Sequence, residues 1–399
     1  MDTPLSKRVL SIKPSPTLAV TARAAALKAA GKDIIGLGAG EPDFDTPDHI
    51  KAAAIAAIER GFTKYTAVDG MPSLKAAIIA KFKRDNGLTY TPNQILVSCG
   101  GKQSFYNLVQ AIVNAGDEVI IPAPYWVSYP DIVILADGKP VIVEAGIEQG
   151  FKITPAQLEK AITPKTRMVI INSPSNPTGA VYTRDDLAGL GEVLRRHPNV
   201  LIATDDMYEH ISLDDAPFVN ILNACPDLYE RTMVLNGVSK AYAMTGWRIG
   251  YAAGAEEIIQ AMTNVQSQST SNPTSISQVA AEAALNGDQG CMAPMVAAFK
   301  ERHKLVVGGL NALPGVKCLI AGGAFYAFPD MRDAIRHLHA IGKLKAPTDL
   351  ELAEYLLEQA GVAVVPGSAF GAEGYVRLSF ATSKANLQNA LVRMAKALV

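Results

Sequence analysis

The 399-residue sequence lacks a large net charge of either sign, a close pair of cysteines and a long apolar run. Its formal net charge is −1, which gives no basic surface for nucleic acid or an anionic membrane. No stretch approaches the roughly 18–20 apolar residues that a membrane-spanning helix needs. The first residues include basic side chains but no apolar core behind them, unlike a secretory signal. We therefore expect a cytoplasmic protein.

The four cysteines are also too scattered to form a recognisable motif. Their spacing predicts neither a disulfide framework nor a metal-binding knuckle, and we expect no metal. They are Cys99, Cys225, Cys291 and Cys318. The composition, 49% hydrophobic and 19% charged, is that of an ordinary globular protein, and the length predicts about two domains.

Short runs rich in Val and Ile alternate with helical patterns between about residues 90 and 255. Runs such as "QILVS", "DEVIIPA" and "RMVIIN" are bounded by turn residues. This alternation predicts an α/β fold with a mostly parallel, seven-stranded sheet between helices. In such sheets ligands bind beyond the carboxyl ends of the strands, so the residues that follow each run are the candidates for a site.

The pattern changes beyond Gly290. A long helical segment, short strands and further helices predict a smaller α+β domain. The N-terminal segment has too little core of its own and is expected to pack on that domain. The predicted division is 47–292 for the large domain, with 1–46 and 293–399 forming the N-terminal arm and the small domain.

Three stretches at predicted strand ends carry polar groups. They are "CGGKQ" (99–103), "SPSNPTG" (173–179) and "TDDMYEH" (204–210). The first favours an anion at a helix start, though a plain tight turn is an equal alternative. Asn176 lies between two prolines, and its bond to the following proline is a candidate for cis geometry. Asp205 follows a buried strand. A carboxylate there is expected to have a cationic or hydrogen-bond partner, and the alternative is that Asp205 is a helix N-cap.

A fourth stretch, "VLNGVSKAYAMTGWRIGY", places Lys240 after an apolar run and Arg248 soon after it. A lysine in an apolar pocket has a lowered pKa and can attack a carbonyl, and an arginine fork suits phosphate. Each alone could be a solvated loop charge. Together with an anion-binding turn, a strand-end Asp and an Asn amide, they describe a site for a phosphorylated aldehyde with a basic ring nitrogen, pyridoxal 5'-phosphate.

With these motifs the sequence resembles the class I aminotransferases, which are pyridoxal-phosphate enzymes of fold type I. It is most similar to the bacterial aspartate aminotransferase branch, which includes the aspartate/prephenate aminotransferases. The resemblance runs from about Leu10 to the C-terminus. It rests on motifs that include "AGEPDFDTP", "GGKQ", "SPSNPTGAVY", "DDMYEH", "NGVSKAYAMTGWRIGY", "GAFY" and "VRLSFATS".

The resemblance implies how the cofactor ring is held. Lys240 matches the lysine that binds the cofactor covalently and then moves the substrate proton. Asp205 matches the carboxylate that pairs with the ring nitrogen and keeps it protonated. Tyr208 and Asn176 match groups that hydrogen-bond the phenolic oxygen, and Trp126 matches the aromatic that stacks on the ring.

The resemblance also implies a phosphate cradle and a dimer. The cradle consists of Gly100, Gly101, Lys102 and Arg248. Gly237 stands where some relatives carry a phosphate-binding Ser, so that bond is missing or comes from Ser239. Tyr65 matches a tyrosine that reaches the phosphate of the neighbouring subunit, which implies a homodimer with shared sites.

For the substrate, Arg377 matches the arginine that clamps the α-carboxylate as a bidentate pair. Gly40 matches a backbone contact on a segment that closes over the substrate. No second arginine is evident for a distal carboxylate, and Lys102 with Thr17, and with Ser15 as a further candidate, is expected to bind it. Trp126 and Asn176 are expected to contact the substrate as well.

These roles imply ping-pong transfer of the amino group of L-aspartate to 2-oxoglutarate, giving oxaloacetate and glutamate in amino acid biosynthesis. A bifunctional aspartate/glutamate-prephenate aminotransferase is the first alternative, and a β-lyase that releases pyruvate and ammonia is the second. A third is the effector domain of a transcription regulator. That one is disfavoured because fewer than roughly fifteen residues precede the resemblance and no basic surface is expected.

Overall fold

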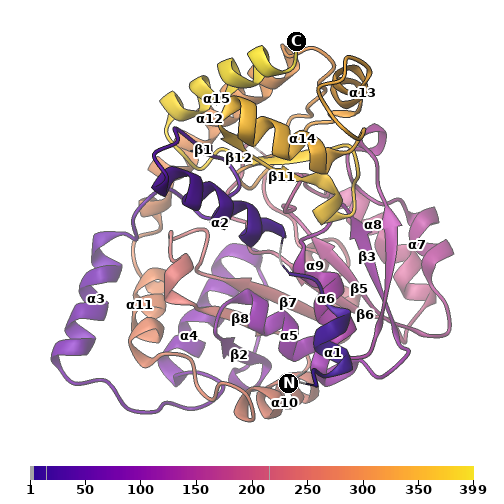
Figure 1. The fold of residues 1–399 in the computed structure, drawn as a ribbon. Helices are drawn as coiled ribbons and strands as arrows, with labels where there is room; N and C mark the ends of the chain where they lie inside the picture. Colours follow the sequence, from indigo (N-terminus) through magenta and orange to yellow (C-terminus); the bar gives the residue numbers. More distant parts are fainter. Residues whose placement is uncertain (1–3, 15, 215) are drawn as a thin grey trace.

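The structure is a computed structural model that describes residues 4–14, 16–214 and 216–399. A seven-stranded sheet with helices on both faces forms the larger part, and two small sheets lie beneath the C-terminal helices (Figure 1). Ser15, one of the candidates for the distal-carboxylate site, lies outside the described residues. Among those residues no helix is long and apolar enough to cross a bilayer.

The large sheet has the strand order β2-β8-β7-β6-β5-β3-β4. Its strands are β2 (Ile95–Ser98), β3 (Glu118–Ala123), β4 (Lys139–Glu144), β5 (Thr166–Asn172), β6 (Leu201–Asp205), β7 (Thr232–Gly237) and β8 (Gly250–Ala253). β8 pairs antiparallel with both of its neighbours, and the other neighbouring pairs are parallel. The predicted α/β class and its mostly parallel, seven-stranded sheet are therefore confirmed.

Both faces of this sheet are buried, because successive side chains of a strand point to opposite faces. In β3, Ile120 joins one apolar core and Ile121 joins the other. The helices against the first core are α4 (Pro72–Lys81), α7 (Pro155–Ala161), α8 (Arg184–Arg196), α9 (Ile221–Ala224) and α11 (Ser275–Asn286). Those against the second are α5 (Gly101–Ile112), α6 (Ser128–Leu135) and α10 (Glu256–Ser267). Helix α3 (Asp48–Glu59) packs on α11 and adds Ile50 and Ala54 to the first core, and α1 (Lys7–Ser11) packs on α6.

The C-terminal part is built on short strands. One sheet has the order β11-β12-β9, and the other pairs β1 with β10 in parallel. These strands are β1 (Ile35–Gly36), β9 (Tyr326–Ala327), β10 (Val362–Ala363), β11 (Val365–Pro366) and β12 (Val376–Ser379). The helices are α12 (Ala293–Asn311), α13 (Arg332–Ala340), α14 (Asp349–Tyr355) and α15 (Lys384–Ala397). The domain division stays a prediction.

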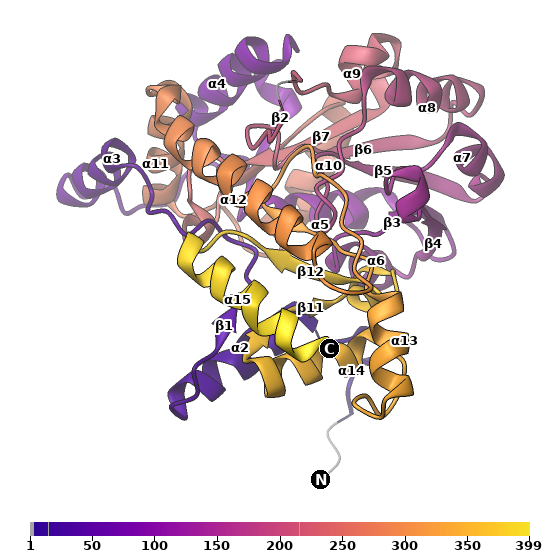
Figure 2. The ribbon, with the colours of Figure 1, turned by 90° about the horizontal axis from the view of Figure 1, so that it is seen from above.

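Part of the N-terminal segment packs on the C-terminal elements, whereas α1 packs on α6 of the large part. Helix α2 (Pro16–Ala29), drawn in indigo, lies beside the C-terminal elements in both views (Figure 1, Figure 2). Its Ala24 shares a small buried cluster with Ile34, Leu357 and Ala363. Helix α2 and the C-terminal elements therefore build one part of the molecule together.

Two local expectations are wrong. The bond after Asn176 is not cis, whereas cis bonds precede Pro124 and Pro174. The cis preference of any X–Pro bond is small, so a sequence cannot choose among nearby prolines. Asp205 is also not followed by a helix. Its strand leads into a turn at 207–210, and the chain then forms an isolated bridge between Ser212 and Gly323.

Candidate active site

A cleft of about 970 Å³ opens beyond the carboxyl ends of β5, β6 and β7, between the large sheet and the C-terminal part. Twelve of the predicted site residues line it. They are Thr17, Gly40, Gly101, Lys102, Trp126, Asn176, Asp205, Tyr208, Ser239, Lys240, Arg248 and Arg377. The structure thus brings together side chains that lie far apart in the sequence.

Lys240 follows β7 and lines this cleft with a partly buried side chain. Its Nζ donates to the carbonyl oxygen of Gly40 at 2.6 Å. Burial lowers the pKa of the Lys240 amine to about 8, and the positive charges of Arg248 and Arg377 act in the same direction. At pH 7 about a tenth of this amine is therefore uncharged and nucleophilic, far more than for an ordinary lysine with a pKa of about 10.4.

Asp205 is the last residue of β6, and its carboxylate receives two hydrogen bonds. The Tyr129 hydroxyl donates to Oδ2 at 2.5 Å, and the Met207 N–H donates to Oδ1 at 3.3 Å. Burial raises the pKa of the Asp205 carboxyl, while these two bonds and the charge of Lys240 favour the ionised form. Sequence reasoning assigned no role to Tyr129, which lies in the apolar helix α6.

The predicted phosphate cradle lies where β2 leads into α5. Gly100, at the N-cap of α5, has a φ of +88°, and a Cβ there would lie 2.2 Å from Arg248 Nη2. The Arg248 guanidinium donates to the carbonyl oxygens of Thr245 and Cys99, at 2.9 and 3.3 Å. Glycine is therefore required for the guanidinium to lie over the free N–H groups of a helix start, which together form an anion site.

Some relatives carry a phosphate-binding serine at the position of Gly237, and steric crowding explains the glycine in this chain. A Cβ at this position would lie 3.0 Å from Gly250 Cα and from the Ile249 carbonyl oxygen. Ser239, two residues further on, is buried and lines the cleft. A serine at position 237 would crowd β8, which leaves Ser239 as the nearby hydroxyl.

At the other side of the cleft, Arg377 is 2% exposed and lies over the rings of Tyr326 and Phe370, 4.5 and 4.9 Å from their centroids. Nη1 donates to Asn176 Oδ1 at 2.9 Å and Nη2 to the Gly38 carbonyl oxygen at 2.7 Å. Its Nε is buried without a hydrogen-bond partner among the described residues. A fixed guanidinium with an unused donor is suited to an anionic ligand.

Lys102 and Thr17 supply a second polar patch in the same cleft. The Lys102 ammonium lies 5.2 Å from the centroid of the Trp126 ring, and burial lowers its pKa, with the charge of Arg248 adding to the effect. Thr17 Oγ1 is buried and has no partner among the described residues. An unsatisfied hydroxyl and a cation in the same cleft fit a second anionic group.

Tyr208 reaches the cleft in contact with Tyr326, a tyrosine to which the sequence analysis assigned no role. Its hydroxyl shares a hydrogen bond with that of Tyr326 at 2.8 Å, and Lys240 Nζ lies 5.9 Å from its ring centroid. Asn172 also lines the cleft, donating to the Asp205 carbonyl oxygen at 3.0 Å and accepting from the Asn176 N–H at 2.9 Å. The motif "GAFY" pointed to Tyr326, but no sequence signal marked Asn172.

Two predicted residues do not line the cleft. Gly100 lies directly behind it at the start of α5, beside Gly101, which does line it. Tyr65 is 91% exposed and lies away from it. Its predicted role requires a second subunit.

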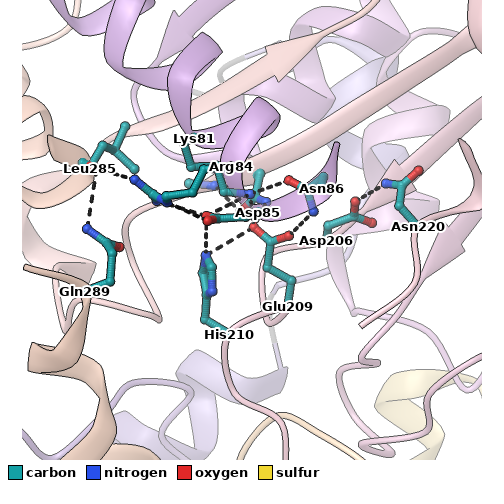
Figure 3. Close-up of polar contacts among 12 residues, drawn as sticks. Lys81, Arg84, Asp85, Asn86, Asp206, Glu209, His210, Asn220, Leu285 and Gln289 are labelled. Atoms are coloured by element: carbon teal, nitrogen blue, oxygen red, sulfur yellow. Dashed lines mark hydrogen bonds and ion pairs between the residues drawn. The ribbon is translucent and has the colours of Figure 1, made fainter. Parts of the chain in front are cut away.

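Buried charged side chains fix the turn that follows Asp205 (Figure 3). The Glu209 carboxylate accepts from Lys81, from Asn86 Nδ2 at 2.7 Å and from Asn236 Nδ2 at 2.7 Å. These partners lie at the end of α4, in the π-helical turn η1 (Phe82–Asn86) and in β7. Glu209 therefore ties three elements to the segment that carries Asp205 and Tyr208.

Asp206 takes part in the same buried region. Its carboxyl accepts from the Thr204 hydroxyl at 2.6 Å and from the Asn220 amide. Burial is the main cause that raises the pKa of Asp206 to about 8, and the negative charge of Glu209 acts in the same direction. Within the described ranges, no group of three or more His, Cys, Asp and Glu side chains is arranged to hold a metal ion.

Comparison with known proteins places this geometry in context. Residues 32–394 match the family described as "Aminotransferase class I and II". The chain is 67% identical to an aspartate/prephenate aminotransferase of Nitrosomonas europaea, over 99% of each chain. It is 58% identical to one of Cereibacter sphaeroides, over 98% of this chain and 97% of the other.

Solved structures show the same likeness. The aspartate aminotransferase of Rhizobium meliloti has a TM-score of 0.94 and 52% identity, with 99% of each chain covered. The aspartate aminotransferase of Thermus thermophilus, solved with maleate, has a TM-score of 0.92 and 44% identity, with 99% of this chain and 100% of the other covered.

Proposed function

The chain belongs to the class I and II aminotransferases, and on that basis we propose that it transfers the amino group of L-aspartate to 2-oxoglutarate. The products are oxaloacetate and L-glutamate. The two half-reactions use one cleft in turn, so the kinetics are ping-pong. The substrates are small amino acids and 2-oxo acids. The cytoplasmic location stays a prediction.

The cleft fits pyridoxal 5'-phosphate, the cofactor of this family, by its set of donors. A partly neutral lysine, a strand-end carboxylate and an anion cradle at Gly100 and Arg248 match an aldehyde, a basic ring nitrogen and a phosphate. When bound, this group supplies a carbonyl that receives the amino group and a ring that delocalises the electron pair left on Cα.

The chain's own residues have separate tasks in this proposal. Lys240 would hold the cofactor and, with its amine released, would move the proton from the substrate Cα to the cofactor carbon that receives the amino group, and in the opposite direction during the second half-reaction. Asp205 holds a proton on the ring nitrogen as a buried carboxylate. Tyr208 and Asn176 bind the phenolic oxygen, Trp126 covers the ring, and Ser239, Gly101 and the Lys102 N–H bind the phosphate.

One observation carries the substrate assignment. Two cationic side chains, the buried Arg377 and the exposed Lys102, line the same cleft as Lys240. Arg377 is assigned the α-carboxylate and Lys102 with Thr17 the distal carboxylate. Two cationic groups in the same cleft as the reactive amine favour a dicarboxylic substrate over an apolar one. Gly40, whose carbonyl holds Lys240, is assigned the backbone contact to the substrate.

Prephenate is proposed as a further amino acceptor. Two close relatives carry the name aspartate/prephenate aminotransferase, and prephenate, like aspartate, has two carboxylates. The β-lyase alternative is disfavoured because the presence of Lys102 as a second cation, in addition to Arg377, favours a dicarboxylic substrate.

We further propose a homodimer with shared sites. Tyr65 is 91% exposed, and Ile55 and Ile58 are each 55% exposed nearby in sequence. An exposed aromatic with exposed aliphatic neighbours is typical of a surface that another subunit covers. In this arrangement Tyr65 reaches the phosphate of the partner's site.

A kinetic panel tests the proposal. Aspartate, glutamate, phenylalanine and alanine serve as donors, with 2-oxoglutarate, oxaloacetate and prephenate as acceptors. We expect the dicarboxylic donors to show the highest kcat/KM and Lys240→Ala to lose both turnover and the visible absorbance of the bound cofactor. An intact visible band in Lys240→Ala would refute the assignment of the lysine. Pyruvate release from cystathionine or cysteine would support the β-lyase instead.

A further inference from the structure

The hydroxyl of Tyr129 is directed at Asp205 from a helix on one face of the sheet. Tyr129 lies in α6, is 1% exposed, and donates to Asp205 Oδ2 at 2.5 Å. Its ring is fixed edge-on between two others, with centroid distances of 4.9 Å to Phe105 and 5.2 Å to Trp126. The side chain therefore has one position, and its hydroxyl has one evident partner.

This bond completes the surroundings of the carboxylate. Oδ1 accepts the Met207 N–H and Oδ2 accepts the Tyr129 O–H, so each oxygen of Asp205 has a donor from the protein. Burial raises the pKa of the Tyr129 phenol well above its usual range, so the hydroxyl keeps its proton and remains a donor. Donors to a buried carboxylate favour its ionised form against the effect of burial.

Resting on the function proposed above, we propose that Tyr129 is a positioning residue that keeps Asp205 ionised and oriented toward a basic ring nitrogen. The same side chain contacts Trp126, so one residue supports both the group that pairs with the ring and the group that covers it. A phenylalanine would fill the same space between the neighbouring rings. The hydroxyl is therefore the part of Tyr129 that this role requires.

Binding to the full-length chain freed of cofactor separates the role of the hydroxyl from packing. Calorimetry compares pyridoxamine 5'-phosphate, which does not bond covalently to Lys240, with its 1-deaza analogue, in which carbon replaces the ring nitrogen. We expect Tyr129→Phe to weaken binding of the first about 10- to 100-fold and to leave binding of the second nearly unchanged, because a hydrogen bond to a charged group is lost.

Two further variants make the test specific. Tyr229→Phe removes another tyrosine hydroxyl bond, to the Thr89 carbonyl oxygen at 2.6 Å, away from the cleft, and should leave both affinities unchanged. Asp205→Asn should abolish the preference for the ring nitrogen, and adding Tyr129→Phe to it should then have little further effect. Thermal unfolding of each variant shows whether the fold is intact.

Equal weakening of both ligands in Tyr129→Phe would overturn the inference and make Tyr129 a packing residue. No weakening of either would overturn it as well. If the wild-type chain binds neither ligand, the proposed function itself fails. If the wild type prefers the ring nitrogen through Asp205 but Tyr129→Phe keeps that preference, only the inference about Tyr129 fails.

Discussion

Arg377 Nη1 donates to Asn176 Oδ1 at 2.9 Å across a sequence separation of 201 residues. The arginine lies in β12 and the asparagine in the turn after β5, so this bond connects the C-terminal sheet to the large sheet at the cleft. Nη2 adds a third segment by donating to the Gly38 carbonyl oxygen. Arg377, the residue assigned to the substrate α-carboxylate, thus joins three parts of the chain.

The first prediction concerns this fork. Arg377→Lys keeps a positive charge but loses the planar pair of donors and the bonds to Asn176 and Gly38. We expect KM for both aspartate and 2-oxoglutarate to rise about 10- to 100-fold. Arg393→Lys, at an exposed site paired with Asp33, is the control and should leave KM unchanged. An unaltered KM in Arg377→Lys would exclude the proposed carboxylate contact.

The sequence predicted much of the site because its signals are local. Asp205, Lys240 and the glycines before α5 each follow a Val- and Ile-rich strand, and the edge of a parallel sheet gathers such positions. The roles came from the family resemblance. The strand pattern alone located the residues but left a plain turn or an N-cap as alternatives for several of them.

Other parts could not be predicted from the sequence, because they depend on how distant segments pack. Tyr129 lies in an apolar helix and is typical of a core aromatic, and only the packing of α6 on the sheet places its hydroxyl on Asp205. The contacts of Glu209 with Lys81 and Asn236 likewise join three elements. Tertiary hydrogen bonds of this kind leave no periodic signal in the chain.

The second prediction tests the shared sites. Lys240→Ala destroys a chain's own site, and Tyr65→Ala is expected to impair only the site of its partner. In an equal mixture of the two variants, refolded together, half of the dimers should be hybrids with one site that has both side chains. Activity should therefore return to about a quarter of the wild-type value. A mixture no more active than its components would contradict sharing through Tyr65.

The third prediction concerns the Lys240 amine in the chain freed of cofactor. Because its pKa is lowered to about 8, labelling by an amine reagent should rise with pH and reach half of its maximum near pH 8. An unperturbed lysine would continue to gain reactivity up to about pH 10.4. Peptide mapping by mass spectrometry follows Lys240 separately from the exposed lysines.

A variant shows the cause of this lowered pKa. Arg248→Met removes a positive charge that disfavours the ammonium form, so the labelling profile should move to higher pH. A profile for Lys240 that matches the exposed lysines in the wild type would show that the amine is not desolvated.

The fourth prediction concerns the buried pair of Lys81 and Glu209, whose side chains are 1% and 3% exposed. Lys81→Met leaves the Glu209 charge buried without its cation and should lower the free energy of unfolding by about 3–5 kcal/mol. Adding Glu209→Gln removes that charge, so the double variant should be more stable than Lys81→Met alone. Urea denaturation measures both.

A surface pair provides the comparison for this loss. Arg195 pairs with Glu192 and Asp227 on exposed side chains, so Arg195→Met should cost only about 0–1 kcal/mol. A double variant less stable than Lys81→Met would mean that Glu209 acts through its hydrogen bonds to Asn86 and Asn236 rather than through its charge.

The fifth prediction follows from Asp206, whose pKa burial raises to about 8 in the folded chain. An aspartate in an unfolded chain has a pKa of about 3.9, so the folded state binds the proton of Asp206 more tightly than the unfolded state does. The stability that this proton contributes is therefore complete below the unfolded pKa and is lost as pH rises toward 8. Asp206→Asn resembles the protonated form and can keep the bonds to Thr204 and Asn220 without titrating.

The variant should consequently gain on the wild type as pH increases. Between about pH 5 and about pH 8.5 the difference in free energy of unfolding should move in favour of Asp206→Asn by about 3–5 kcal/mol. Urea denaturation of both proteins at each pH measures this difference, and groups common to both cancel in it. A difference that stays constant over this range would mean that Asp206 is already ionised at pH 5. The attraction of Lys81 and the bonds from Thr204 and Asn220 would then outweigh its burial beside Glu209.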